Sequence, residues 1–247
     1  MLSKSIVKYI QSLSHKKFRD EHGVFIAEGP KVVQELLSSA KFKCKIICAL
    51  KNWFDENAPG NSAEEIFEMN EVELEKISLL KTPNNVLAVF YKKQHEVREI
   101  NHSVSLMLDE IQDPGNMGTI IRTADWFGIK NIICSNECAE HYNPKVVQAS
   151  MGSIARVNIL YADLENFIKS NSVNIYAAAL QGSNIFSMDT IKEGIILIGN
   201  ESKGIKENLL SLSSKQITIP KYGEAESLNA AVACGIILSQ LVYGNTL

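Results

Sequence analysis

The chain has 247 residues, a formal net charge of −3, 45% hydrophobic residues and 21% charged residues, which is the ordinary composition of a globular protein with a sizeable buried core. No apolar run approaches the ~20 residues that a membrane-spanning helix needs, and the amino terminus lacks the apolar core of a secretory signal. The five cysteines are an odd number, so we expect reduced thiols and a cytoplasmic protein.

Charge is distributed unevenly along the chain. Residues 1–45 hold nine Lys and Arg against four Asp and Glu, whereas residues 46–100 hold six against ten. The basic part includes Lys16, Lys17 and Arg19, which we expect to bind RNA phosphates. A solvated helix face is the alternative for a cluster of this size.

The first 92 residues alternate helical and strand patterns, which predicts a small α/β domain. Helices are predicted over 6–13, after Gly29-Pro30, and from an N-cap at Asn70 to Leu80. Strands are predicted at 24–27, 44–50, 66–67 and 86–91, with a loop at 57–62. The polar residues 93–102 are expected to form a linker to a second domain.

From residue 103 to 247 strands and helices alternate regularly, which predicts an α/β domain with a mostly parallel sheet covered on both faces. Strands are predicted at 104–108, 129–134, 157–161, 175–180, 195–198 and 217–220. Helices are predicted at 118–127, after Asn143-Pro144, after Asp163, after Gly204 and from Ser227 onward.

Three short motifs follow strands of this second domain. They are N-M-G-T-I-I-R at 116–122, G-N-E-S-K-G at 199–204 and S-L-N at 227–229. Because α/β folds place ligand-binding loops outside the carboxyl ends of their strands, the three motifs together predict one active site. Taken singly, Asn116 and Ser227 have an alternative as helix caps, Arg122 as a surface residue, and Gly199 as a turn glycine.

Other types of site are disfavoured. G-N-E-S-K-G-I-K is similar to a P-loop but has Ile205 where that motif requires lysine, and the chain contains no G-x-G-x-x-G. The Cys44/Cys48 and Cys134/Cys138 pairs have no companion histidines at zinc-site spacing, so we expect no metal.

The ordered motifs N-x-G-x-x-x-R, G-N-E-x-x-G and S-L-N resemble those of the SpoU/TrmH-type RNA 2′-O-ribose methyltransferases of the SPOUT superfamily, over roughly residues 104–243. Residues 18–33 and 82–89 resemble that family's substrate-binding domain, a ribosomal-protein-like RNA-binding α/β unit. The resemblance implies a parallel-sheet α/β domain with a trefoil knot, an exception to the rule that chains do not thread loops. It also implies a homodimer with sites near the interface.

The resemblance further implies S-adenosyl-L-methionine as the cofactor, held largely by backbone atoms of the knotted loops. Carried over residue by residue, the cofactor positions are Ala179, Leu180, Gly199, Ile219 and Leu228. The catalytic positions are Asn116, Arg122, Glu201, Ser227 and Asn229. The implied substrate is a ribose 2′-hydroxyl of guanosine or uridine in ribosomal RNA. The alternatives are transfer RNA, a non-catalytic RNA-binding protein on the same scaffold, and an unrelated nucleotide-binding protein.

Methyl transfer from a sulfonium requires mainly that the enzyme align the 2′-oxygen and remove its proton. Arg122 is the base proposed for the family, but a guanidinium stays protonated. We therefore expect Arg122 to orient the 2′-hydroxyl and a phosphate, with the other four catalytic residues holding Arg122 and the ribose. Glu224 and Glu226 lie beside the site. They face solvent or a partner subunit, or else they face RNA, and then Lys221 and the basic amino-terminal residues must compensate for their charge.

Overall fold

The computed structural model describes residues 2–57, 62–93 and 100–243. The chain divides into two compact units, the first made of Met1–Gln94 with His141–Ala155 and the second of His95–Glu140 with Arg156–Leu247. Residues 94–99 of the expected linker lie outside the described residues, so the boundary at 93–102 stays a prediction. In the described part of the chain, no helix is long and apolar enough to cross a membrane.

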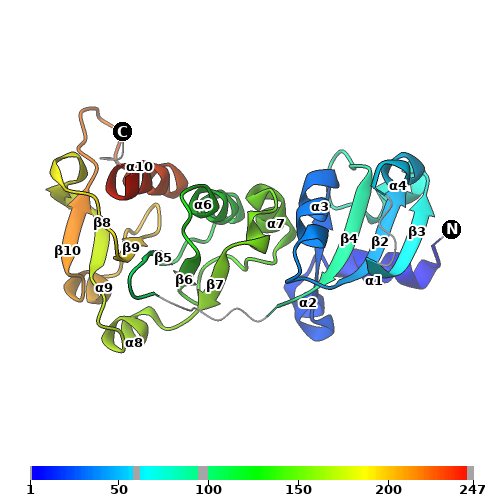
Figure 1. The fold of residues 1–247 in the computed structure, drawn as a ribbon, viewed down its shortest axis with the longest axis horizontal. Coiled ribbons are helices and arrows are strands. Elements are labelled where there is room, and N and C mark those ends of the chain that lie inside the picture. Colours follow the sequence, from blue (N-terminus) through cyan, green and yellow to red (C-terminus); the bar gives the residue numbers. More distant parts are fainter. Residues whose placement is uncertain (1, 58–61, 94–99, 244–247) are drawn as a thin grey trace. The chain divides into compact units, whose positions relative to one another are not determined.

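The first unit is built on a four-stranded sheet in the order β1-β4-β2-β3 (Figure 1). Its strands are β1 (Val24–Glu28), β2 (Cys44–Leu50), β3 (Ala63–Met69) and β4 (Val86–Tyr91). Strand β4 is antiparallel to both β1 and β2, and β2 is parallel to β3. The helices of the same segment are α1 (Lys4–Ser12), α2 (Lys16–His22), α3 (Pro30–Ser38), α4 (Lys51–Asn57) and α5 (Glu71–Ile77).

Both faces of the sheet are covered at its inner strands, which explains why β4 is a continuous apolar run and why β2 is apolar from Ile46 to Leu50. On one face Ile10 of α1, its C-cap Leu13 and Leu74 of α5 join a cluster with Ile26 and Val89. The other face is covered by α3 and α4 through Val33, Leu36 and Trp53. Helix α7 (Pro144–Ser150) adds Val147 to that second cluster.

The strand predictions at 24–27, 44–50 and 86–91 are confirmed. Asn70 is the N-cap of α5 and forms a reciprocal capping box with Glu73, but the helix ends at Ile77 instead of Leu80. Helix α4 was not predicted. It is seven residues long and buries one side chain, Trp53, so it is too short to show a helical period. In the loop predicted at 57–62, Asn57 is instead the last residue of α4, and residues 58–61 lie outside the described residues.

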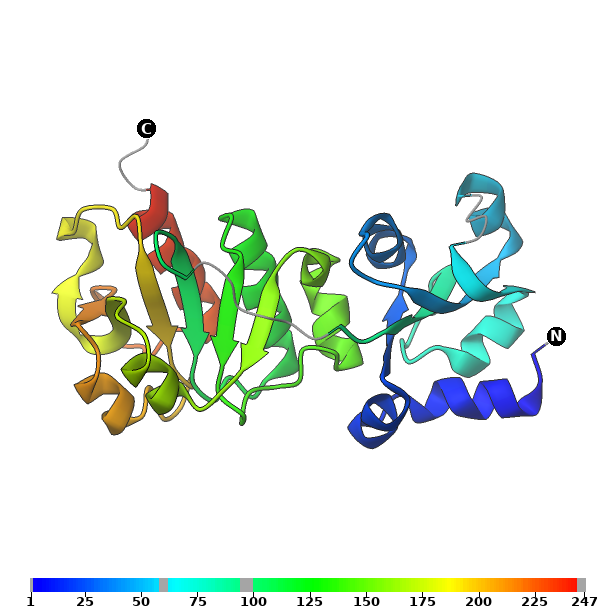
Figure 2. The ribbon, with the colours of Figure 1, turned by 60° about the horizontal axis from the view of Figure 1, so that its bottom comes forward.

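The second unit has a six-stranded sheet in the order β10-β8-β9-β5-β6-β7 (Figures 1 and 2). Its strands are β5 (Val104–Leu108), β6 (Asn131–Cys134), β7 (Asn158–Tyr161), β8 (Ile175–Asn184), β9 (Gly194–Ile198) and β10 (Lys215–Thr218). Every neighbouring pair is parallel. The predicted parallel sheet is therefore confirmed.

Helices cover both faces of this sheet, as predicted (Figure 1). Two pack together on one face, α6 (Pro114–Trp126) and α10 (Ala230–Tyr243). The other face carries α8 (Leu164–Lys169) and α9 (Glu207–Ser211), which bury Leu164, Ile168 and Leu209 against the strands. In the part of the chain that the structure describes, no three His, Cys, Asp or Glu residues are grouped to hold a metal ion.

The chain's path through the sheet reverses beside β5. Strands β6 and β7 extend the sheet on one side of β5, and β9 and β8 lie on the other. The carboxyl ends of β5 and β9 are therefore neighbours, with Asp109 and Glu110 following one and Gly199 and Asn200 following the other. Ligands of open α/β sheets bind beside such a reversal.

Candidate active site

Residues from all three sequence motifs meet in one hydrogen-bonded group. Asn116 Nδ2 donates to Glu201 Oε1, and Asn229 Nδ2 donates to Asn116 Oδ1 at 2.8 Å. Ser227 Oγ lies 3.5 Å from the backbone oxygen of Glu201, to which it donates. Four of the five predicted catalytic residues are thus brought together from positions up to 113 residues apart.

Arg122 is the predicted catalytic residue that stands apart from this group. It lies on the exposed side of α6, and among the described residues it forms no hydrogen bond or ion pair. Arg122 is six positions after Asn116, and on an α-helix this offset is about 9 Å along the axis and about 120° around it. Within one copy of the chain the other four residues therefore do not hold Arg122, contrary to our expectation.

Helix capping explains how Asn116 and Asn229 become available. Asp113 caps α6 by accepting the Asn116 N–H at 2.8 Å, so the side chain of Asn116 is free to point at Glu201. Residues 113–116 form the cap and first turn of the helix. At α10, Asn229 Oδ1 accepts the N–H groups of Ala231 and Val232 at 3.0 and 3.2 Å. Asn229, and not Ser227, is therefore the cap.

A cavity of about 880 Å³ opens beside this group. All five predicted cofactor residues line it: Ala179, Leu180, Gly199, Ile219 and Leu228. Glu201 and Ser227 line it too, so the predicted catalytic and cofactor positions share one space. The volume falls in the range of about 300–1,000 Å³ that small-molecule sites occupy. Glu226 also lines the cavity, which favours the interpretation that this loop acid faces the site.

Gly199 allows the G-N-E-S-K-G loop to close on itself. A Cβ atom added at Gly199 would lie 2.5 Å from Ile205 N and 2.6 Å from Gly204 O, closer than real Cβ contacts. The loop is closed by two backbone hydrogen bonds, Asn200 N to Gly204 O at 3.1 Å and Gly204 N to Asn200 O at 2.9 Å. The close approach at Gly199 is therefore made by the loop's own backbone, and Gly204, with φ +71°, supplies the left-handed turn residue.

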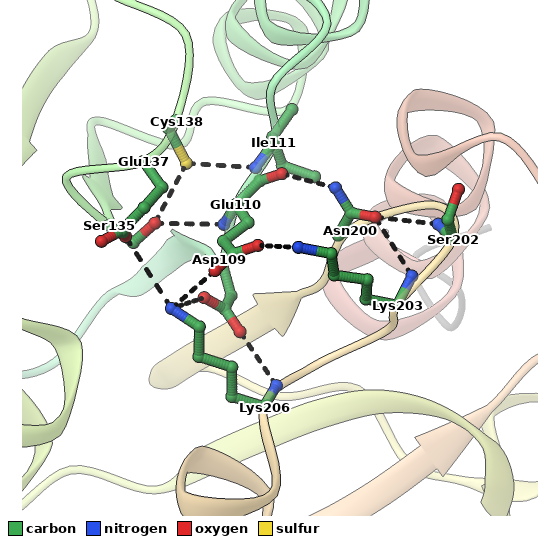
Figure 3. A network of polar contacts seen from close by, with 10 residues as sticks. All are labelled: Asp109, Glu110, Ile111, Ser135, Glu137, Cys138, Asn200, Ser202, Lys203 and Lys206. Atoms are coloured by element: carbon green, nitrogen blue, oxygen red, sulfur yellow. Dashed lines mark hydrogen bonds and ion pairs between the residues drawn. The ribbon is translucent and has the colours of Figure 1, made fainter.

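Side chains tie this loop to the end of β5, as Figure 3 shows. Asn200 Nδ2 donates to Glu110 O at 2.8 Å, and its Oδ1 accepts the N–H of Ser202 at 2.9 Å and that of Lys203 at 3.1 Å. Lys203 Nζ and Lys206 Nζ bind opposite oxygens of the Glu110 carboxylate at 3.2 and 2.8 Å. The backbone that carries Glu201 is thus anchored on both sides.

The charges of this network stabilise one another. The hydrogen bonds from Lys206 and then Lys203 lower the pKa of Glu110, and the hydrogen bond to Glu110 raises the pKa of Lys206. Buried Asp109 accepts the Lys206 N–H at 2.9 Å. The three sequence motifs do not predict roles for Asp109 and Glu110, nor for Lys203 and Lys206 as their partners. The available signal was an acidic pair directly after a buried strand.

The predicted RNA-binding residues separate into two groups. Lys16 and Lys17 are exposed on α2. Arg19 is only 1% exposed, and its Nη1 donates to the backbone oxygens of Leu13 and Ser14 at 2.9 and 2.8 Å. These two bonds occupy its guanidinium at the end of α1. The prediction that Arg19 binds RNA is therefore wrong: it is a structural residue.

Comparison with known proteins relates both parts of the chain to described families. The SpoU rRNA Methylase family model matches residues 103–239, and that of the MRM3-like substrate binding domain matches residues 4–88. The 23S rRNA (guanosine(2553)-2′-O)-methyltransferase RlmP of Bacillus subtilis is 28% identical, over 95% of this chain and 95% of its own. A 23S rRNA (uridine(2479)-2′-O)-methyltransferase of Streptomyces viridochromogenes is 29% identical, over 72% of this chain and 63% of its own.

Solved structures give the same relationship along nearly the whole chain. An AdoMet-bound rRNA methyltransferase from Sinorhizobium meliloti superposes with a TM-score of 0.85 and 32% identity, covering 98% of this chain and 95% of that one. A TrmH-family structure from Porphyromonas gingivalis has a TM-score of 0.86 and 32% identity, covering 99% of this chain and 100% of that one.

Proposed function

The chain belongs to the SpoU rRNA methylase family, and from that premise we propose that it transfers a methyl group from S-adenosyl-L-methionine to a ribose 2′-hydroxyl of ribosomal RNA. The observation that carries the proposal is the joining of Asn116, Glu201, Ser227 and Asn229 beside a cavity of about 880 Å³. A non-catalytic RNA-binding protein has no need of that arrangement. The relatives that modify 23S rRNA favour ribosomal over transfer RNA.

The cavity suits this cofactor by its chemistry. Its walls include apolar side chains such as Ile217, Ile219 and Leu228, which suit an adenine ring, while Glu201 and Glu226 bring carboxylates that suit a cationic ligand. When bound, S-adenosyl-L-methionine supplies a methyl group already activated by its sulfonium. Backbone groups of the loops at 199–204 and 219–228, whose residues include many that line the cavity, would meet the polar needs of the nucleoside.

The remaining work of the site is alignment. Asn116 is held from both sides, by Glu201 and Asn229, so this group keeps a fixed geometry in which to receive the ribose. Such positioning contributes much of the acceleration when the reacting group is already activated. Arg122 carries a permanent positive charge and is exposed. We assign it the binding of a substrate phosphate and the orientation of the 2′-hydroxyl.

We also propose a homodimer, as the family resemblance implies. Trp126 on α6 is 84% exposed, and Val232 on α10 is 52% exposed. These two helices pack together, and large exposed apolar side chains on adjoining helices favour an association surface. Replacing Trp126 by Glu is expected to convert a dimer to a monomer, measured by light scattering during gel filtration. A dimeric mass that persists in the variant would contradict this placement of the interface.

The trefoil knot and the domain boundary at 93–102 remain family-based proposals, as does the cytoplasmic location. The last is supported by the five cysteines, which are all unpaired and buried, because disulfides are rare in reducing compartments.

The function is tested in two steps. Calorimetric titration with S-adenosyl-L-methionine is expected to give one site per chain, and labelled methyl groups should pass to ribosomal RNA isolated from cells that lack the protein. The products should resist alkaline cleavage at the modified ribose. Arg122→Ala should bind the cofactor normally while losing at least about a hundredfold in rate. If the protein binds the cofactor but does not methylate ribosomal RNA, the proposal is overturned. If it methylates only transfer RNA, transfer RNA replaces ribosomal RNA as the substrate.

A further inference from the structure

We propose that a row of alternating cationic and aromatic side chains at one end of the first unit's sheet binds a single-stranded segment of the RNA substrate. The row, called here the lysine–tyrosine row, consists of Lys43, Tyr91, Lys45, Tyr9 and His22 in spatial order. The inference rests on the proposed function, since it names the face of the first unit that would engage the RNA. Its members come from α1, α2, the start of β2, the residue directly before β2 and the end of β4.

The distances show a continuous series. Lys43 Nζ lies 5.5 Å from the ring centre of Tyr91, and Lys45 Nζ lies 5.8 Å from the same ring. Lys45 also stands 5.1 Å from the ring centre of Tyr9 and donates to its hydroxyl at 3.3 Å. The Tyr9 ring then meets His22 edge-on, with ring centres 5.1 Å apart. Each cation is thus placed over an aromatic face within cation–π range.

A β-bulge creates this arrangement. Along β2, Cys44 pairs with Phe90 and Ile46 pairs with Val89, so the register against β4 skips Lys45. Bulges add a residue to one strand and redirect its side chain. As a result Lys45 reaches the rings of Tyr9 and Tyr91, which pack against the same core cluster that buries Ile46. The bulge therefore places Lys45 on the same face of the sheet as Ile46, where regular alternation along the strand would place Ile46 alone.

The row can take up an anion at low cost. The side chain of Lys43 is 71% exposed and is paired with Glu64, itself 40% exposed. Glu64 also accepts a hydrogen bond from the Tyr91 hydroxyl at 3.0 Å. Because an exposed ion pair contributes little to stability, a phosphate that replaces Glu64 beside Lys43 can accept the hydrogen bond from the Tyr91 hydroxyl in its place. The surrounding segment is favourable, since residues 1–45 carry nine basic against four acidic residues in a chain whose net charge is −3.

The chemistry of the row favours a single strand over a duplex. Proteins bind single-stranded nucleic acid by pairing cations that follow the phosphates with aromatic rings on which bases stack. The tyrosines are half-buried, so their rings are already fixed and little entropy is lost when a base stacks on them. In a duplex the base faces are covered by neighbouring pairs. A duplex could therefore contact the lysine–tyrosine row only through its phosphates.

The first experiment separates charge from stacking. Full-length protein is titrated with a labelled 12-nucleotide single-stranded RNA and with the duplex of the same sequence, at several salt concentrations. The Lys43→Gln/Lys45→Gln variant should bind the single strand at least about tenfold more weakly at low salt, with the slope of log Kd against log salt reduced by about 1.4 for two lost phosphate contacts. A matched control, Lys76→Gln/Lys81→Gln, removes two exposed lysines outside the row of the same unit. It should stay within about twofold of wild type.

The tyrosines should act differently. Tyr9→Leu/Tyr91→Leu should weaken single-strand binding by about tenfold or more while leaving the salt slope unchanged, and Tyr9→Phe/Tyr91→Phe, which keeps both rings, should retain the affinity. Thermal unfolding of each variant establishes that it is folded. A lysine variant with the Kd and salt slope of wild type would overturn the proposal. The proposal would also be overturned if the control variant lost as much affinity for RNA as the lysine variant. It would likewise be overturned if the lysine variant no longer bound poly-glutamate but still bound RNA as wild type does.

The row and the proposed function fail separately. If wild-type protein methylates ribosomal RNA and the row variants share its KM, the row is wrong and the function stands. If no RNA is methylated yet the row variants still lose single-strand affinity, the function is wrong and the row stands.

Discussion

Gly199→Ala is expected to impair both the stability of the G-N-E-S-K-G loop and cofactor binding. The added methyl group would lie 2.5 Å from Ile205 N and 2.6 Å from Gly204 O, about 1 Å inside an ordinary contact. These neighbours are backbone atoms and cannot rotate away, so the loop must open. Opening breaks the two hydrogen bonds between Asn200 and Gly204. At about 1 kcal/mol for each bond the loss is about 2 kcal/mol, which corresponds to about thirtyfold in Kd if the cofactor requires the closed loop.

Calorimetric titration with S-adenosyl-L-methionine, together with thermal unfolding, measures this effect. Gly223→Ala is the matched control, since Gly223 lines the same cavity and a Cβ added there meets nothing within 4 Å. The control should bind the cofactor within about twofold of wild type. If Gly199→Ala binds as tightly as Gly223→Ala and unfolds at the same temperature, the loop does not depend on the close approach at Gly199.

Three further predictions concern residues with defined partners. Asn229→Asp keeps an oxygen to cap α10 but removes the amide that donates to Asn116. We therefore expect a methylation rate at least about tenfold lower with little change in melting temperature. A variant that methylates at the wild-type rate would refute the role of that hydrogen bond. Glu110 has a lowered pKa because Lys206 and Lys203 bind it. The stability that it adds is therefore present above the ordinary carboxyl pKa of 4.5 and is lost as the pH falls through the lower pKa of the folded state. Wild type should therefore melt at a higher temperature than Glu110→Gln, and this difference should shrink as the pH falls below 4.5. A difference that grows on acidification would contradict the assignment. Arg19→Ala should destabilise the chain by about 2–4 kcal/mol in urea unfolding, because it removes a buried side chain with two hydrogen bonds, whereas Lys16→Gln/Lys17→Gln should unfold like wild type.

The sequence predicted the strands well because their signals are local. The buried parallel strand β9 is an unbroken apolar run, and β5 is apolar except for Ser105. Asp163 and Asn143 indicate the starts of their helices because their side chains cap them. The ends of elements were less predictable. Helix α6 begins at Pro114, four residues before the predicted start, because an Asp-Pro pair can open a helix as well as a turn.

The residues of the site were predicted from motifs, but their connections were not. That Asn116 bonds to both Glu201 and Asn229 depends on how three distant loops come together, and no local pattern encodes such a distance. Arg19 shows the opposite limit. Its charge and basic neighbours suggested a surface residue, while the backbone oxygens of Leu13 and Ser14 that it satisfies became visible only in the folded chain.

The closed loop at 199–204 also constrains how the family can change over evolutionary time. Its two ends are joined by backbone bonds, and its interior is tied to β5 through the side chain of Asn200. An insertion or deletion here would break a closure whose length is set by geometry, so we expect homologues to vary this loop by substitution only. The exposed segment 221–226 carries no such closure among the described hydrogen bonds. Relatives can gain or lose residues here at little cost in stability, but because Lys221, Gly223 and Glu226 line the cavity, such changes would also reshape the site.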